Sequence, residues 1–192
     1  MDIYDVHASD IWTHGFIGRN DGSWRVNLDV LFCKSRPIVR VDFSGVDMAD
    51  APFWDGAIAM NAMERSLGKN NTPGCALLKG LNNNCRDNLW LALYARVGQY
   101  NDVRSCCVLM EEDDGLVYIF GKKDGTVKQT FEDLMACGEL TSAHLASMNG
   151  LSLNAASTRL KTLYDLGLCY RASEETHYVY HFVGEGLKEK HS

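Results

Sequence analysis

The sequence predicts an α/β fold for residues 1–121 and a smaller unit of helices and strands for residues 122–192. In the first part, short apolar runs rich in β-branched residues alternate with amphipathic stretches of helical length, a pattern typical of a sheet covered by helices. In the last third, two helical stretches with capping residues precede an alternating strand pattern. The polar segment Lys122–Gly125 separates the two parts and is the best candidate for a domain boundary.

The first predicted elements are two strands on either side of a helix. Ile11–Phe16 is a candidate strand, and Ile38–Phe43 is a β-branched run flanked by turn residues, which is typical of a buried strand. Between them, Trp24–Cys33 carries apolar residues on one side and is a candidate helix that ends before Pro37. These elements begin the predicted strand and helix alternation.

Two further helices and a strand continue this alternation. Pro52–Leu67 is predicted to be a helix with proline in its first turn, and Asn84–Val97 is predicted to be another with leucines spaced for burial. Cys75–Leu78 is a candidate core strand between them. Alternating strands and helices imply parallel strands with helices across them.

A hairpin is predicted to close the α/β part. Val103–Met110 and Gly115–Phe120 are two strand-like runs on either side of the polar loop Glu111–Gly115. The hairpin would make the sheet mixed, with parallel and antiparallel neighbours. After the boundary, Val127–Cys137 is predicted to be the first helix of the C-terminal unit.

The remaining C-terminal elements have the order of a winged helix-turn-helix. Thr141 is a cap for a short helix with Leu145 and Met148 facing inward, and Gly150 ends that helix. Ser152 is a cap for a second helix with an inward apolar stripe, formed by Leu153, Ala156, Leu160, Leu163 and Leu166. Tyr178–Phe182 then supplies a strand of a two-stranded tip. We therefore expect α/β and winged helix-turn-helix domains in one chain.

Polar and cationic side chains on the second helix are the candidate DNA-binding residues. The predicted contacts are Thr141, Ser152, Asn154, Ser157, Thr158, Arg159 and Lys161, with Arg171 on the following strand. Such groups meet phosphates and base edges when a recognition helix enters the major groove. The alternative is a solvated helix face on a winged helix that binds protein. Glu174 and Glu175 at the predicted wing tip favour this alternative, because acidic groups repel phosphates.

Composition limits the classes of protein to which the chain can belong. The net charge of −6 argues against indiscriminate binding to nucleic acid. No stretch of about 20 uninterrupted apolar residues is present, and the N-terminus lacks a basic secretory start, so we expect a cytoplasmic protein without membrane contact. Seven cysteines without a C-x-x-C pair predict reduced, mostly buried thiols and no structural zinc.

The sequence does not favour an enzyme, a metal centre or a cofactor. It contains no glycine-rich phosphate loop, no G-x-S-x-G and no H-E-x-x-H, and its six histidines form no ligand-spaced cluster. Four aspartates near the end of the Ile38–Phe43 strand, at 42, 47, 50 and 55, could hold magnesium, but a capped acidic turn is the favoured interpretation. A small-ligand pocket near Asp42 and Phe43 is a third, weaker hypothesis.

Short motifs resemble two families of bacterial regulators. Val39–Val46, which reads VRVDFSGV, precedes an acidic turn and a helix beginning near Phe53, and this pattern resembles STAS-like domains. Residues 126–183 resemble the winged helices of MarR- and ArsR-type regulators. In partner-switching STAS domains a serine or threonine after this strand is phosphorylated, but Asp47–Phe53 contains no hydroxyl residue. The resemblance therefore implies a bacterial regulator whose STAS-like domain docks a partner or dimerises.

Two hypotheses about function follow. The first is a DNA-binding transcriptional regulator that reads an operator through its winged helix, with the α/β domain used for homodimerisation or partner docking. The second is a regulator without catalytic activity that binds protein through both domains and never contacts DNA.

Overall fold

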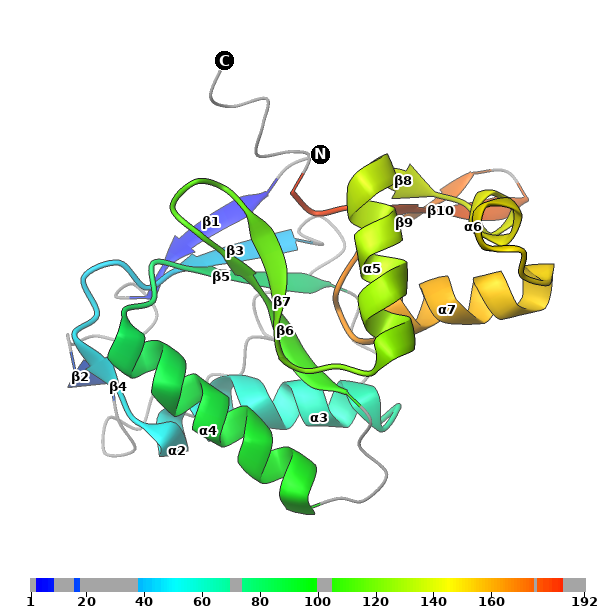
Figure 1. The fold of residues 1–192 in the computed structure, drawn as a ribbon. Coiled ribbons are helices and arrows are strands. Elements are labelled where there is room, and N and C mark those ends of the chain that lie inside the picture. The colour runs from blue at the N-terminus through cyan, green and yellow to red at the C-terminus, as the bar shows by residue number, and fades with distance from the viewer. Residues whose placement is uncertain are drawn as a thin grey trace.

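The fold is known from a computed structural model, which describes residues 3–8, 16–17, 38–69, 74–99, 105–174 and 176–184 (Figure 1). It is a mixed α/β structure, which confirms the predicted class at that level. The predicted helix Trp24–Cys33 and nearly all of the predicted strand Ile11–Phe16 lie outside the described residues.

A five-stranded sheet with the order β1-β3-β5-β6-β7 forms the centre of the molecule. Its strands are β1 (Tyr4–His7), β3 (Ile38–Asp42), β5 (Cys75–Lys79), β6 (Cys106–Glu111) and β7 (Val117–Lys122). The first four are parallel, and β7 pairs with β6 in antiparallel fashion. The parallel strands and the closing hairpin were both predicted; β1 was not.

Helices cover one face of this sheet. They are α2 (Ala51–Trp54), the π-helical turn η4 (Asp55–Ala59), α3 (Met60–Ser66) and α4 (Asn83–Gln99). The Asp50 carboxylate caps α2 by accepting the Phe53 N–H at 2.8 Å. Trp54 of α2 and Phe43, the residue after β3, are fully buried between this layer and the sheet, with ring centroids 4.9 Å apart. A short pairing of β2 (Phe16–Ile17) with β4 (Met48–Ala49) lies beside it.

The C-terminal elements follow the order helix, strand, two helices, two strands. The helices are α5 (Gly125–Cys137), α6 (Ser142–Asn149) and α7 (Leu153–Asp165). The strands β8 (Glu139–Leu140), β9 (Tyr170–Glu174) and β10 (His177–His181) form a second sheet in the order β8-β10-β9. The two-residue strand β8 was not predicted.

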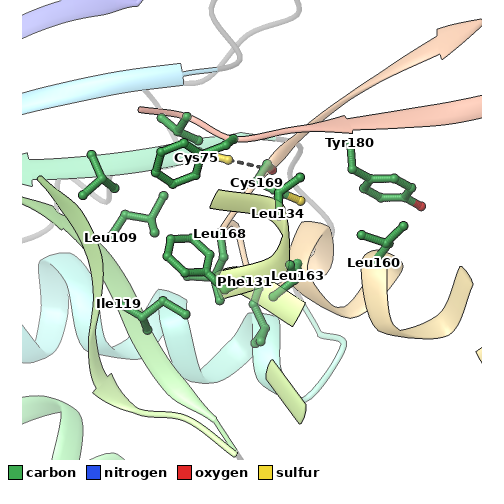
Figure 2. Packing of buried hydrophobic residues seen from close by; sticks show 14 of the residues in the cluster. Cys75, Leu109, Ile119, Phe131, Leu134, Leu160, Leu163, Leu168, Cys169 and Tyr180 are labelled. Carbon is green, nitrogen blue, oxygen red and sulfur yellow. Dashed lines mark hydrogen bonds between the residues drawn. The ribbon is translucent and has the colours of Figure 1, made fainter. Parts of the chain in front are cut away.

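The C-terminal elements pack against the second face of the central sheet. Leu109 and Ile119 from that sheet share one buried cluster with Phe131 and Leu134 of α5 and Leu163 of α7 (Figure 2). Apolar surface is therefore removed from water on both sides of the sheet, which stabilises the two parts of the chain as one packed structure.

Two expected core residues are instead exposed. Leu153 has 59% of its surface accessible and Met148 has 45%, although Leu145, Ala156 and Leu160 on the same two helices are buried as predicted. Leu153 is the first residue of α7 and Met148 is the penultimate residue of α6. Side chains at helix ends near a turn have fewer neighbours to cover them, so helical spacing alone overestimated the apolar stripe.

Candidate functional site

The two predicted helix caps are formed as expected. The Thr141 hydroxyl accepts the His144 N–H at 3.1 Å, and the Ser152 hydroxyl accepts the Ala155 N–H at 3.2 Å. Each satisfies a backbone donor that has no partner within its own helix. The two hydroxyls thereby fix where α6 and α7 begin.

Helix α7 has one buried and one exposed face. Ala156, Leu160 and Leu163 are fully buried. The exposed side chains include four predicted contacts: Asn154, Ser157, Thr158 and Lys161. The polar groups on this exposed face are available to a ligand that approaches from solvent.

Two of these exposed residues already have partners within α7. The Thr158 hydroxyl donates to the Asn154 carbonyl oxygen at 2.9 Å, and the Lys161 ammonium forms an ion pair with Asp165 one turn later. An exposed pair of this kind contributes little to stability and is exchanged easily for another anion. Lys161 therefore remains a usable cation.

Arg159 lies apart from the outward face on which it was expected. Its side chain is half-buried and lines a cavity of about 440 Å³, together with Asp124 at the start of α5 and Ser66 at the end of α3. Within the described part of the chain, no hydrogen bond or ion pair engages the Arg159 guanidinium. The reason is its angular position: Arg159 lies three residues after the buried Ala156 and four before the buried Leu163, which places it at the edge of the apolar stripe.

Arg171 is held between two tyrosine rings. Its guanidinium carbon lies 3.9 Å from the ring centroid of Tyr164 on α7 and 4.2 Å from that of Tyr178 on β10. Both distances are short enough for cation–π attraction. Arg171 was predicted to contact a phosphate. Its two stacking partners could not be predicted from the sequence, because they come from different elements.

The tip of the β9–β10 hairpin is acidic in its described part. Glu174 is exposed and lies 3.7 Å from the His177 imidazole, and Glu175 is outside the described residues. A second histidine, His181, has its Nδ1 3.4 Å from the Glu139 carboxylate. The two histidines thus each face a carboxylate rather than each other.

Three of the four aspartates near the end of β3 are each engaged separately. Asp42 accepts the Ser44 N–H at 2.8 Å and lies 3.9 Å from the Lys79 ammonium, Asp50 caps α2, and Asp55 forms an ion pair with Arg96. The favoured interpretation, a capped acidic turn, is confirmed for Asp50. Across the described residues, no group of three or more His, Cys, Asp or Glu side chains is arranged to hold a metal ion.

The cysteines are mostly buried free thiols, as predicted. Five of the described ones are buried, and Cys137 is exposed. Cys106 and Cys107 belong to the apolar clusters on opposite faces of the sheet. Burial raises the pKa of Cys75, Cys106 and Cys107 to about 12 in each case. These thiols are therefore protonated and unreactive at neutral pH.

An exposed aromatic surface on α4 was missed by the sequence analysis. Trp90, Leu91 and Tyr94 have 42%, 58% and 58% of their surfaces accessible. The Trp90 ring lies 5.6 Å from that of Tyr94 and 5.7 Å from that of Phe120 on β7. The signal was present in the sequence, because these residues fall outside the leucine stripe that packs against the sheet.

Comparisons with known proteins include a partial likeness to a solved structure. No family model matches this chain, and no curated protein matches it. A crystal structure of the fragment 1–100 of a possible transcriptional regulatory protein from Mycobacterium bovis is 31% identical in sequence. It aligns with 35% of this chain and 71% of that chain, with a TM-score of 0.29. Separately, no helix in the described ranges is long and apolar enough to cross a membrane.

Proposed function

We propose that this protein is a transcriptional regulator that binds DNA, and that residues 125–184 form a winged helix-turn-helix. The order α5, β8, α6, α7, β9, β10 supports the proposal, since it supplies a helix pair joined by a tight turn and a hairpin after the second helix. In this proposal α7 is the recognition helix and the β9–β10 hairpin is the wing.

The two-sided character of α7 carries the proposal. Its apolar face is fixed in the buried cluster, so the helix is held rigidly, while Asn154, Ser157 and Thr158 near its N-terminal end are exposed. In helix-turn-helix proteins this end of the recognition helix contacts base edges. The Asn154 amide and the Ser157 hydroxyl offer both donors and acceptors for such contacts, and the Thr158 hydroxyl, which donates to the Asn154 carbonyl oxygen, offers an acceptor.

Charge sets the expected character of binding. With a net charge of −6 and an acidic hairpin tip at Glu174, few phosphate contacts are available, and Lys161 is the exposed cation on α7. Each phosphate contact adds about one unit to the slope of log affinity against log salt concentration. We therefore expect a shallow salt dependence and a larger share of the affinity from base contacts.

The test is selection of bound duplexes from a random pool, followed by measurement of the affinity for the selected duplex by fluorescence anisotropy. Asn154→Ala is expected to weaken binding by about tenfold, which corresponds to the loss of one good base contact. Asn84→Ala is the matched control, because Asn84 is also exposed and is also the second residue of its helix. The proposal is rejected if no duplex is selected, or if Asn154→Ala and Asn84→Ala bind alike.

A second candidate function is protein binding through the α/β part, without DNA. The exposed Trp90, Leu91 and Tyr94 on α4 favour it, because aromatic residues and leucine exposed together mark interaction surfaces. The same surface would serve the homodimer that a palindromic operator requires. It would also fit the STAS-like docking role.

Light scattering and co-purification separate these roles. Leu91→Gln is expected to abolish self-association or partner capture, whereas Leu116→Gln, a change at an equally exposed leucine in the β6–β7 turn, is expected to leave both intact. Equal behaviour of the two variants would remove the α4 surface from consideration.

A further inference from the structure

We infer that the cavity beside α7 is a binding site for a small organic acid that carries hydroxyl or amino groups next to its carboxylate or phosphate. The cavity lies where α3, the start of β6, α5 and α7 meet, so residues from both the α/β part and the C-terminal elements line it. The inference concerns a ligand other than DNA and does not depend on the proposed DNA binding.

The size of the cavity suits a metabolite. Its volume is about 440 Å³, within the range of roughly 300–1,000 Å³ that small-molecule sites occupy. Its lining combines polar groups with the apolar side chains of Val127 and Leu166. Such a mixture holds the body of a ligand while a few polar groups fix its orientation.

Two groups in the lining are suited to an anion. The half-buried Arg159 guanidinium has no hydrogen bond or ion pair from any described residue, and it offers a planar set of donors that fits a carboxylate or a phosphate. Only 3% of the Ser105 surface is accessible. The Ser105 hydroxyl oxygen accepts the Asp124 N–H at 3.2 Å. Its O–H proton therefore remains available to the same anion.

Three other groups in the lining can only accept hydrogen bonds from a ligand. The Thr158 and Thr162 hydroxyls already donate hydrogen bonds to the carbonyl oxygens of Asn154 and Thr158, at 2.9 Å each. One oxygen of the Asp124 carboxylate accepts the Val127 N–H at 2.8 Å, and the other remains available to accept from a ligand. A ligand that fits must bring donors to these oxygens.

The presence of both Arg159 and Asp124 in the lining of one cavity disfavours simple anions as ligands. A sulfate or an unsubstituted dicarboxylate would face the Asp124 carboxylate without a proton to share, which costs affinity. A hydroxyl or amino group next to the acid group turns this repulsion into a hydrogen bond. The site should therefore prefer ligands that carry a hydroxyl or amino donor over those that lack one. It should accept either a carboxylate or a phosphate as the acid group.

The experiment is an NMR titration of the ¹⁵N-labelled full chain with three probes: malate, succinate and glycerol 3-phosphate. Malate and succinate differ only by one hydroxyl group, so they test the donor requirement. Glycerol 3-phosphate tests the phosphate as an alternative acid. We expect malate or glycerol 3-phosphate to shift the amide signals of residues 124–127 and 158–162. Malate should bind at least about five times more tightly than succinate.

Two variants with the same change of charge on the same helix test the site. Arg159→Gln is expected to weaken binding of the hydroxylated probe by about tenfold or more, because it removes the charged donor. Lys161→Gln is the matched control: Lys161 is exposed, pairs with Asp165 and does not line the cavity. It is expected to change the affinity less than twofold.

Three results would overturn the inference. The first is that none of the three probes binds, and the second is that succinate binds as tightly as malate. The third is that Lys161→Gln weakens binding as much as Arg159→Gln, which would indicate attraction to the general charge of the helix. Thr162→Val retains the shape of the side chain without its hydroxyl oxygen, and equal affinity in that variant and the native chain would exclude its acceptor role.

Discussion

The Cys75 thiol donates a hydrogen bond to the Cys169 carbonyl oxygen at 2.8 Å (Figure 2). Cys75 begins β5 in the central sheet, and Cys169 directly precedes β9 in the C-terminal sheet. Both residues are almost completely buried. The contact thus ties the start of the β9–β10 hairpin to the α/β part across 94 residues of chain.

Cys75→Ala is expected to loosen this connection. It leaves the Cys169 carbonyl without the thiol donor and opens a small void, so the free energy of unfolding should fall by about 1–3 kcal/mol. Amides in β9 and β10 should then exchange with solvent faster relative to amides in β3. Urea unfolding and hydrogen exchange measure the two effects.

Cys106→Ala is the matched control for this change. Cys106 is equally buried, but it belongs to the cluster on the helical face of the sheet and its thiol lies 3.9 Å from the Ala59 carbonyl. This variant should lose stability without a selective effect on β9 and β10. A selective effect in both variants would contradict the proposed role of Cys75.

Gly167 is a second junction between the two parts, and Gly167→Ala is expected to be strongly destabilising. Gly167 has a φ of +72°, and a Cβ atom there would lie 2.6 Å from the Arg65 guanidinium and 3.1 Å from the Gly74 carbonyl oxygen. Arg65 is itself held by hydrogen bonds to the Gly74 carbonyl and the Asn61 side chain. We expect a loss of about 2–4 kcal/mol from backbone strain and steric conflict together.

Gly150→Ala separates these two contributions. Gly150 has a similar φ of +61°, but a Cβ atom there would have no neighbour within 4 Å. This variant should lose only about 1 kcal/mol, which is the conformational cost of a left-handed alanine. If chemical denaturation gave equal losses for the two variants, the contact between Gly167 and Arg65 would have no energetic importance.

The buried thiols are expected to make the protein sensitive to alkali. Burial raises the pKa of Cys107 to about 12, above the ordinary value of 9.0. Between these values the unfolded thiol loses its proton and the folded one keeps it, so stability is fully present below about pH 9 and is lost as the pH rises toward the folded-state pKa. Each such thiol lowers the free energy of unfolding by about 1.4 kcal/mol per pH unit in this window.

The slope of stability against pH isolates this effect from other titrating groups. Cys107→Ala should reduce the slope by about 1.4 kcal/mol per pH unit between about pH 9.5 and about pH 11. An unchanged slope in Cys107→Ala would show that this thiol ionises in the folded protein.

Local patterns explain why much of the fold could be predicted. Ala156, Leu160 and Leu163 repeat at helical spacing after the capping residue Ser152, and the structure buries all three. By contrast, β1 consists of four residues, none of them fully buried, at the edge of the sheet. An edge strand of this kind has no apolar alternation to reveal it.

The candidate site was harder to predict, because side-chain direction depends on neighbouring elements. Arg159 sits at the border between the two faces of α7, and only the position of α5 decides that it lines a cavity. For the same reason the sequence gives no indication that Tyr164 and Tyr178 converge on Arg171. Contacts between distant segments are set by packing, which helical spacing does not contain.

The stacking of Arg171 between Tyr164 and Tyr178 is expected to fix the β9–β10 hairpin against α7. Arg171→Gln should lower the free energy of unfolding by about 1 kcal/mol, and Arg171→Lys should lower it less, since lysine keeps the charge but lacks the planar group. A double-mutant cycle with Tyr178→Leu checks the contact directly: the coupling energy should be about 0.5–1 kcal/mol. Additive losses would mean that the ring of Tyr178, half of which is exposed, does not hold the guanidinium in solution.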